Sequence, residues 1–264
     1  MKRLIIALCG LGIAVSYIAF RLVSAIHAAD YPVTALVTEV IDGDTIKLKS
    51  GQLLRYIGID TPELKRRQKD TWIDAQEQLA VEAKSRNEKL VLGKTISIEY
   101  DTDKKDAYGR LLGYAFTEST FVNEQLLNEG LAFFLYFPPN IMHAGRLRQA
   151  VQYAADNKIG LWKIAAENMR TAHDPAIPIG TLVTITGMIQ EVTRTDRVTY
   201  LNFGTDYTTD VTGIIFKRSY PLFDGYPPVK LLKRKRVHII GMVKEYNGPE
   251  IIINSPEQLF IINK

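Results

Sequence analysis

Short runs that alternate apolar and polar residues recur between residues 32 and 118, and turn residues separate them. Such runs are typical of half-buried β-strands. The sequence therefore predicts five strands, over residues 33–41, 45–49, 53–59, 95–100 and 111–116. Asp42-Gly43 falls between the first two runs, where this dipeptide favours a hairpin turn.

Three segments have helical instead of alternating periodicity, over residues 72–92, 122–129 and 140–158. Gly130 is expected to stop the second helix and Gly160 to cap the third, because glycine tolerates the left-handed conformation that ends many helices. Five strands with three helices fit an OB-fold five-stranded barrel. The fold class predicted for residues 30–170 is therefore mainly β with helices (α+β).

The chain after residue 170 returns to the β-type pattern. Residues 171–180 contain two prolines and little periodicity, which is typical of a linker. Five strand-like runs follow, over residues 181–192, 199–203, 211–216, 236–244 and 251–253, and Asn247-Gly248 predicts a hairpin turn between the last two. We expect residues 181–264 to form a second, smaller OB-like β-barrel, with nucleic-acid binding as one candidate role.

The first 29 residues have the parts of an export signal. Lys2 and Arg3 precede an apolar run over residues 4–20, and small residues follow up to Ala29. This order is typical of a signal peptide, and a run of this length also suffices for an N-terminal membrane anchor. The folded part is periplasmic or secreted in the first case and attached to the membrane through residues 4–20 in the second.

Charge and cysteine content narrow the function classes. The formal net charge is +4, but Lys2, Arg3 and Arg21 lie in the leader, so the remaining chain has 30 basic and 29 acidic residues. Nucleic-acid binding must therefore be argued from local patches. Cys9, the only cysteine, also lies in the leader, which excludes disulfides, a cysteine nucleophile and a zinc knuckle from the rest of the chain.

Two acidic segments flank the second and third predicted strands. Asp44 lies in the turn before this pair of strands and Asp60 lies after it, so both carboxylates can converge at one end of the barrel. Taken alone, the first segment is a common hairpin turn, and the second is a common helix start. Together they supply hard oxygen ligands, and a cation between them would relieve the repulsion of two adjacent acids.

Two arginines and a glutamate accompany these acids. Arg55 lies on an apolar strand, Arg110 begins another strand, and Glu63 follows Asp60 by three positions. A guanidinium can bind two phosphate oxygens, and a carboxylate can orient or deprotonate a water molecule. The alternatives are a structural ion pair for Arg55, a surface position for Arg110 and an exposed first-turn glutamate for Glu63.

The order and spacing of these segments resemble the staphylococcal nuclease (thermonuclease) family over residues 33–162. The matching segments are Asp42-Gly-Asp-Thr, Arg55-Tyr-Ile-Gly-Ile-Asp-Thr-Pro-Glu and Asp106-Ala-Tyr-Gly-Arg. The resemblance implies three groups of residues: calcium ligands (Asp44, Asp60, the backbone carbonyl of Thr61 and, in support, Asp42), phosphate-contacting arginines (Arg55 and Arg110), and a glutamate that activates or orients water (Glu63).

The resemblance also implies an activity. The chain would be a Ca²⁺-dependent nuclease that hydrolyses phosphodiester bonds of DNA and RNA endonucleolytically, leaving 3′-phosphate and 5′-hydroxyl ends, and its leader predicts that it is exported. The alternative is a non-catalytic nucleic-acid-binding protein on a nuclease scaffold. The presence of all the matched residues favours the enzyme.

The residues that would line the substrate depart from the family in part. Ala107 stands where staphylococcal nuclease has a lysine, and Leu135 and Phe137 stand where it has tyrosines. Phe137 can still stack on a base, because stacking needs only an aromatic face, although a core position is an equal alternative. The candidate substrate-binding residues are Tyr108, Tyr136, Phe137, Lys65, Arg66 and Arg67, of which the last three form a basic loop whose alternative is a solvated surface.

A second basic run lies in the C-terminal part, over residues 230–236. Together with nearby aromatic residues, it could form a surface that binds a nucleic-acid strand. These aromatic residues are Tyr200, Phe203, Tyr207 and Phe216. The alternative is a structural or protein-docking module.

Overall fold

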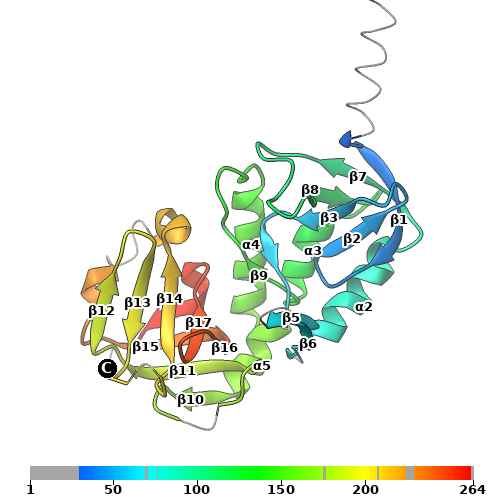
Figure 1. Cartoon of the computed structure of the whole chain (residues 1–264). Helices are drawn as coiled ribbons and strands as arrows, with labels where there is room; N and C mark the ends of the chain where they lie inside the picture. Colours follow the sequence, from blue (N-terminus) through cyan, green and yellow to red (C-terminus); the bar gives the residue numbers. More distant parts are fainter. Residues whose placement is uncertain are drawn as a thin grey trace, which may run out of the picture.

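The structure, a computed structural model, describes residues 30–68, 71–75, 77–174, 177–206, 208–223 and 229–262, without the side chains of residues 66–68, 72, 229 and 230. The predicted leader, residues 1–29, lies outside the described residues. Within the part of the chain that is described, no helix is both long and apolar enough to cross a membrane. Figure 1 shows two β-rich parts with helices between them.

A closed five-stranded barrel forms the first part and confirms the predicted fold class. Its strands follow the order β1 (Thr34–Val40), β2 (Thr45–Leu48), β3 (Leu53–Tyr56), β8 (Leu111–Phe116) and β7 (Thr95–Glu99). Only β3 and β8 run parallel among these neighbours. The alternating pattern buries one side of each strand, as Ile46, Leu54 and Ile96 illustrate. Because Thr45 pairs with Arg55, the β1–β2 turn and the end of β3 lie at the same end of the barrel.

Helices are present in the three regions that the sequence indicated, but with different bounds. They are α2 (Ala80–Val91), α3 (Val122–Asn128) and α4 (Ala144–Asp156). Gly130 follows α3 with a φ angle of 62°, so this glycine does end the helix in the left-handed conformation. A further helix, α5 (Leu161–Glu167), has no counterpart among the predictions.

The prediction of a helix over residues 72–92 is wrong for its first turns. β5 (Lys65–Gln68) and β6 (Thr71–Asp74) form an antiparallel hairpin there, and α2 begins only at Ala80. Leu79 has a left-handed backbone with a φ angle of 68°, which a right-handed α-helix cannot contain. The apolar spacing that suggested a longer helix therefore crosses a turn.

The third predicted helix is also shorter than expected. Residues 140–143 precede α4, because the Asn140 side chain instead exchanges two 2.8 Å hydrogen bonds with the backbone of Asp103. At the other end Lys158, with a φ angle of 51°, takes the left-handed conformation just after α4. Gly160 does not cap this helix. It precedes α5, where its backbone packs against that of Gly130.

The second part consists of two sheets over one apolar core. The four-stranded sheet has the order β10 (Met169–Thr171), β11 (Leu182–Met188), β15 (Arg236–Met242) and β18 (Leu259–Ile261). The five-stranded sheet has the order β12 (Glu191–Arg194), β13 (Val198–Asn202), β14 (Thr212–Phe216), β17 (Pro249–Ile252) and β16 (Lys244–Glu245). Val183, Ile215 and Ile251 are fully buried members of the shared core. The Asn247-Gly248 turn joins β16 to β17 as an antiparallel hairpin.

Several predictions for this second part need correction or lie outside the description. The run 181–192 is divided between β11 and β12. Phe203 is buried in the core and does not belong to a binding surface, while Tyr207 lies outside the described residues. In the basic run, Lys233 forms an ion pair with Glu191 of β12. Ala172, in the segment expected to be a linker, is buried in the same core.

The two β-rich parts pack directly against each other. Leu182 and Met242 of the second part belong to the apolar core of the first. The Gln78 side chain, which precedes α2, accepts a 2.8 Å hydrogen bond from the Leu182 backbone. Arg148 of α4 forms a 2.9 Å ion pair with the buried carboxylate of Glu257. Figure 1 shows α4 and α5 between the barrel and the two sheets, so residues of the second part can reach the barrel.

We expect alanine at Gly130 to destabilise the fold more than alanine at Gly93, although both glycines have positive φ angles. A Cβ at Gly130 would lie 2.2 Å from the Ile159 carbonyl oxygen, whereas a Cβ at Gly93 meets no atom within 4 Å. Gly93→Ala should lower the free energy of unfolding by about 1–2 kcal/mol, the cost of the backbone conformation. Gly130→Ala should lose about 1–3 kcal/mol more in urea unfolding, because of the clash. Equal losses would contradict the close approach of α3 and α5.

Candidate active site

The turn between β1 and β2 is fixed by Asp42 and by the absence of a side chain at Gly43. One Asp42 carboxylate oxygen accepts hydrogen bonds from the backbone of Asp44, at 3.0 Å, and of Thr45, at 2.7 Å. A Cβ on Gly43 would lie only 2.7 Å from the Thr61 side chain. The turn therefore presents the Asp44 carboxylate toward Thr61.

Asp44 is buried and fully engaged by its neighbours. Its Oδ2 atom accepts hydrogen bonds from the Thr61 backbone, at 2.9 Å, and from the Thr61 hydroxyl, at 3.0 Å. The same oxygen lies 3.0 Å from a terminal nitrogen of Arg55. Burial raises the pKa of the Asp44 carboxyl to about 7, and the Arg55 guanidinium opposes this rise.

Arg55 connects the two acidic segments. One terminal nitrogen lies between the carboxylates of Asp44, at 3.0 Å, and Asp60, at 3.2 Å. The other donates 2.9 Å hydrogen bonds to the carbonyls of Tyr56 and Ile59, where the chain turns from β3 into β4 (Ile59–Asp60). The structural ion pair considered as an alternative for Arg55 is thus present, at the centre of the candidate site.

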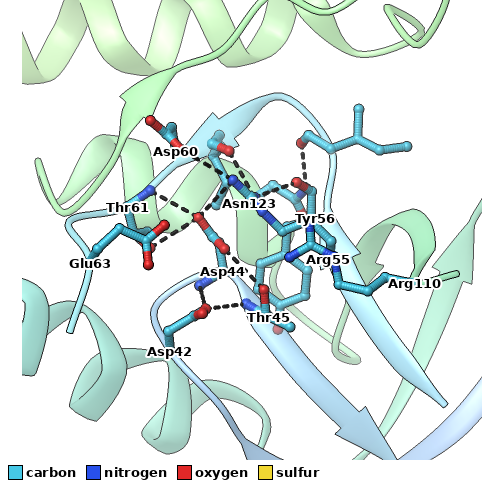
Figure 2. Close-up of polar contacts among 12 residues, drawn as sticks. Asp42, Asp44, Thr45, Arg55, Tyr56, Asp60, Thr61, Glu63, Arg110 and Asn123 are labelled. Atoms are coloured by element: carbon cyan, nitrogen blue, oxygen red, sulfur yellow. Dashed lines mark hydrogen bonds and ion pairs between the residues drawn. The ribbon is translucent and has the colours of Figure 1, made fainter. Parts of the chain in front are cut away.

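Glu63 lies on the opposite side of Asp44 from Arg55 (Figure 2). Its backbone N–H donates a 2.7 Å hydrogen bond to the Glu77 carboxylate. Burial, followed by the charges of Asp44, Asp42 and Asp60, raises the pKa of Glu63 to about 8. Glu63 is half-buried and precedes β5, so the alternative of an exposed glutamate in a first helical turn does not hold.

Arg110 lies on the same side of Asp44 as Arg55 (Figure 2). Its Nε atom donates a 2.7 Å hydrogen bond to Asp106, which also accepts from the backbone of Tyr108 and Arg110. The Arg110 guanidinium lies 5.7 Å from the centre of the exposed Tyr108 ring. Among the described residues, its terminal nitrogens form no hydrogen bond, so they are available to an anion.

The other candidate substrate-binding residues differ in how far they are exposed. Phe137 is exposed, whereas Tyr136 is half-buried and packs against the barrel core. Lys65 is exposed on β5. Arg66 and Arg67 belong to the same strand, but their side chains lie outside the described residues.

The charge balance of the site favours a bound cation. The charges of Asp42 and Asp60 contribute to the raised pKa values of Asp44 and Glu63, and Arg55 is the cation placed between Asp44 and Asp60. Carboxylate and carbonyl oxygens are the ligands that Ca²⁺ takes, so the donor set fits such an ion. Among the described residues, no three His, Cys, Asp or Glu side chains are already close enough to hold a metal.

Three residues near this site were not indicated by the sequence. Glu77, just before α2, binds the Glu63 backbone, and Lys244 of β16 places its Nζ atom 4.0 Å from Glu77. Burial lowers the pKa of Lys244, but the carboxylates of Asp60, Glu77 and Glu63 raise it above its ordinary value. The third residue is Arg218, whose guanidinium lies 5.3 Å from the centre of the Phe137 ring. No motif spacing could reveal these contacts, because two of the residues belong to the second β-rich part.

Comparison with known proteins shows which proteins the barrel is similar to. The family model described as staphylococcal nuclease homologue matches residues 53–164. Endonuclease YncB of Bacillus subtilis is 35% identical over 135 residues, which cover 49% of this chain and 62% of YncB. The thermonuclease of Staphylococcus hyicus is 36% identical over 132 residues, which cover 49% of this chain and 75% of the thermonuclease. The prophage-derived endonuclease YokF of B. subtilis is 35% identical, with 41% of its length covered.

The chain is thus an OB-type barrel protein with carboxylates and arginines paired at one end of the barrel. The chain belongs to the staphylococcal nuclease family, as its match to three quarters of a thermonuclease shows. The family model ends at residue 164, before β11, so the two sheets of the second part lie outside it.

Alanine at Gly43 should separate the β1–β2 turn from Thr61, because a Cβ would lie 2.7 Å from Thr61 and 2.8 Å from Ala83. We expect Gly43→Ala to lower the free energy of unfolding by about 1–3 kcal/mol in urea titrations. The control is Gly145→Ala in α4, where a Cβ meets no atom within 4 Å and helix propensity should improve. A Gly43→Ala protein as stable as the wild type would show that the turn can yield at no cost.

Proposed function

We propose that this protein is an exported, Ca²⁺-dependent nuclease that hydrolyses phosphodiester bonds of DNA and RNA. It cuts endonucleolytically and leaves 3′-phosphate and 5′-hydroxyl ends. The observation that carries the proposal is the pairing of Arg55 with Asp44 and Asp60 at the end of a barrel of the staphylococcal nuclease family. Relatives named as endonucleases and thermonucleases support the reaction class. Export is proposed from the leader sequence.

The arginines bind and stabilise the reacting phosphate. Arg110 has free terminal nitrogens among the described residues, and Arg55 is held in place by two backbone carbonyls. Guanidinium groups fixed in this way need little reorganisation as negative charge grows on the phosphate oxygens. Arg110 also favours departure of the 5′-oxygen, which then takes a proton from solvent.

In its ionised form, which a bound cation would favour, Glu63 positions and deprotonates the attacking water. Its backbone is held by Glu77, and Figure 2 shows its side chain beside Asp44 of the acidic cluster. The water oxygen bonds to phosphorus, its proton passes to the Glu63 carboxylate, and the bond from phosphorus to the 5′-oxygen breaks. A positioned general base of this kind contributes about 10²–10⁴-fold to the rate.

The acidic residues would hold the calcium ion. Asp44, Asp60 and the Thr61 backbone carbonyl are the proposed ligands, with Asp42 supporting the turn that presents Asp44. When bound, the ion neutralises charge on the acids and on the phosphate. The Thr61 backbone is already fixed by its 2.9 Å hydrogen bond to Asp44, so these ligands belong to one connected unit.

Replacement of Glu63 by alanine should impair cleavage far more than binding. We expect kcat on single-stranded DNA and RNA to fall by about 10²–10⁴-fold in Ca²⁺. Affinity for an oligonucleotide, measured by fluorescence anisotropy in a chelator, should change little. The matched control is Glu82→Ala, an exposed glutamate in the first turn of α2. If the wild type binds strands but cuts none with any divalent ion, the protein is the non-catalytic binding protein instead.

Calcium should stabilise the folded protein through Asp60. Ligand that binds only the folded state adds about 2.7 kcal/mol at a concentration of 100 times Kd. The melting temperature of the wild type should therefore rise with Ca²⁺ concentration, and that of Asp60→Asn should rise much less. Asp156→Asn on the exposed side of α4 serves as the control. An identical calcium response in both variants would place the ion elsewhere.

A further inference from the structure

A groove of about 800 Å³ lies on the outer face of the five-stranded sheet. Val198, Tyr200 and Asn202 of β13 and Thr212, Ile214 and Phe216 of β14 line it, together with the tip of the β16–β17 hairpin. The alternate residues of β14, including Ile215, point into the core on the other face. The groove is therefore a surface that the packing of the second part leaves open.

Strand β17 links this groove to a second, smaller cavity beside the candidate active site. A small cavity beside Asp60 and Thr61 is lined from the second part by Lys244 and Ile252. Glu250 lines the groove, pairs with Lys244 across the hairpin and lies two residues before Ile252 on the same face of β17. The outer face of the sheet thus runs from the groove to the carboxylates of the barrel.

Arg218 is a second link between the groove and the candidate active site. Its guanidinium lies 4.5 Å from the centre of the Phe216 ring and 5.3 Å from that of Phe137. It forms no ion pair among the described residues. Burial lowers the pKa of Arg218, and the charge of Asp60 partly offsets this lowering. A half-buried guanidinium close to two rings and to the charge of Asp60 is placed to meet an anionic ligand.

The residues that line the groove favour stacking with bases over neutralisation of phosphate charge. Tyr246 is 79% exposed and lines the groove together with Tyr200 and Phe216. The charged lining residues are Arg197, Asp196 and Glu250, so the groove does not carry a uniformly positive surface. Unpaired bases stack on aromatic rings, whereas a duplex hides its base faces and requires many phosphate contacts. The chemistry therefore suits a single strand.

We propose that this groove binds single-stranded nucleic acid and that Arg218 contacts the strand as it enters the active site of the barrel. The assignment rests on the proposed nuclease function for its orientation, since the strand is the same molecule that is cut. The second part would thus extend the substrate site beyond the nucleotides next to the scissile phosphate. Tyr246 supplies a stacking surface at the far end and Arg218 a cationic contact at the near end.

Binding of the full chain to a single-stranded oligonucleotide of about 20 nucleotides tests the groove. Fluorescence anisotropy in a chelator removes cleavage from the measurement. Tyr246→Ala should weaken binding by about 5- to 100-fold, while Tyr246→Phe, which keeps the aromatic face, should bind like the wild type. The control is Tyr153→Ala, another exposed tyrosine, on α4. Unchanged binding by Tyr246→Ala, or equal losses in the Ala and Phe variants, would overturn the proposal.

The length of the substrate tests the role of Arg218. Arg218→Gln should raise KM by about tenfold or more for the long strand and by a smaller factor for a dinucleotide, because only the long strand reaches past the scissile bond. Arg170→Ala, an exposed arginine of β10, is the control. Equal effects on both substrates would overturn the assignment. If no substrate is cut but the Tyr246 variants still separate in anisotropy, the nuclease function fails while the groove assignment stands.

Discussion

The Arg55 guanidinium, held between Asp44 and Asp60, joins the parts of the structure on which the site depends. Asp44 is buried, and an unpaired buried carboxylate would be costly, so the arginine stabilises the turn in this position. The same arginine binds the carbonyls of Tyr56 and Ile59, which fixes the path of the chain from β3 to β4. One side chain thus stabilises the barrel and arranges the groups proposed to act on phosphate.

The carboxylates around Arg55 leave more negative than positive charge at the candidate site, and a lysine of the second part offsets some of this negative charge. Lys244 of β16 lies near the Glu77 carboxylate and is attracted electrostatically by the carboxylates of Asp60 and Glu63. The site therefore lies at a junction between the family's barrel and a pair of sheets that the family model does not cover. A substrate at this junction would contact both, which gives the second part a direct place in the proposed reaction.

The predictions succeeded where local pattern and structure have the same cause. Alternation of apolar residues identified the barrel strands, because each strand has one buried face. The helix over residues 72–92 was mispredicted because Leu79 takes a left-handed conformation and β6 pairs with β5 as a hairpin. α5 was missed because Gly160 suggests the end of a helix, whereas its contact with Gly130 makes it the start of one.

The sequence alone determined the family and the residues that share a motif: Asp42, Asp44, Arg55, Asp60, Thr61, Glu63 and Arg110. Their spacing reflects strands and turns that are close in the chain, so a pattern along the chain is enough to reveal them. Only the tertiary structure placed Glu77, Lys244 and Arg218 beside them. The contacts of Lys244 and Arg218 accompany the packing of Leu182 and Met242 against the barrel core, which joins segments far apart in the chain. A contact set by packing leaves no fixed spacing in the sequence.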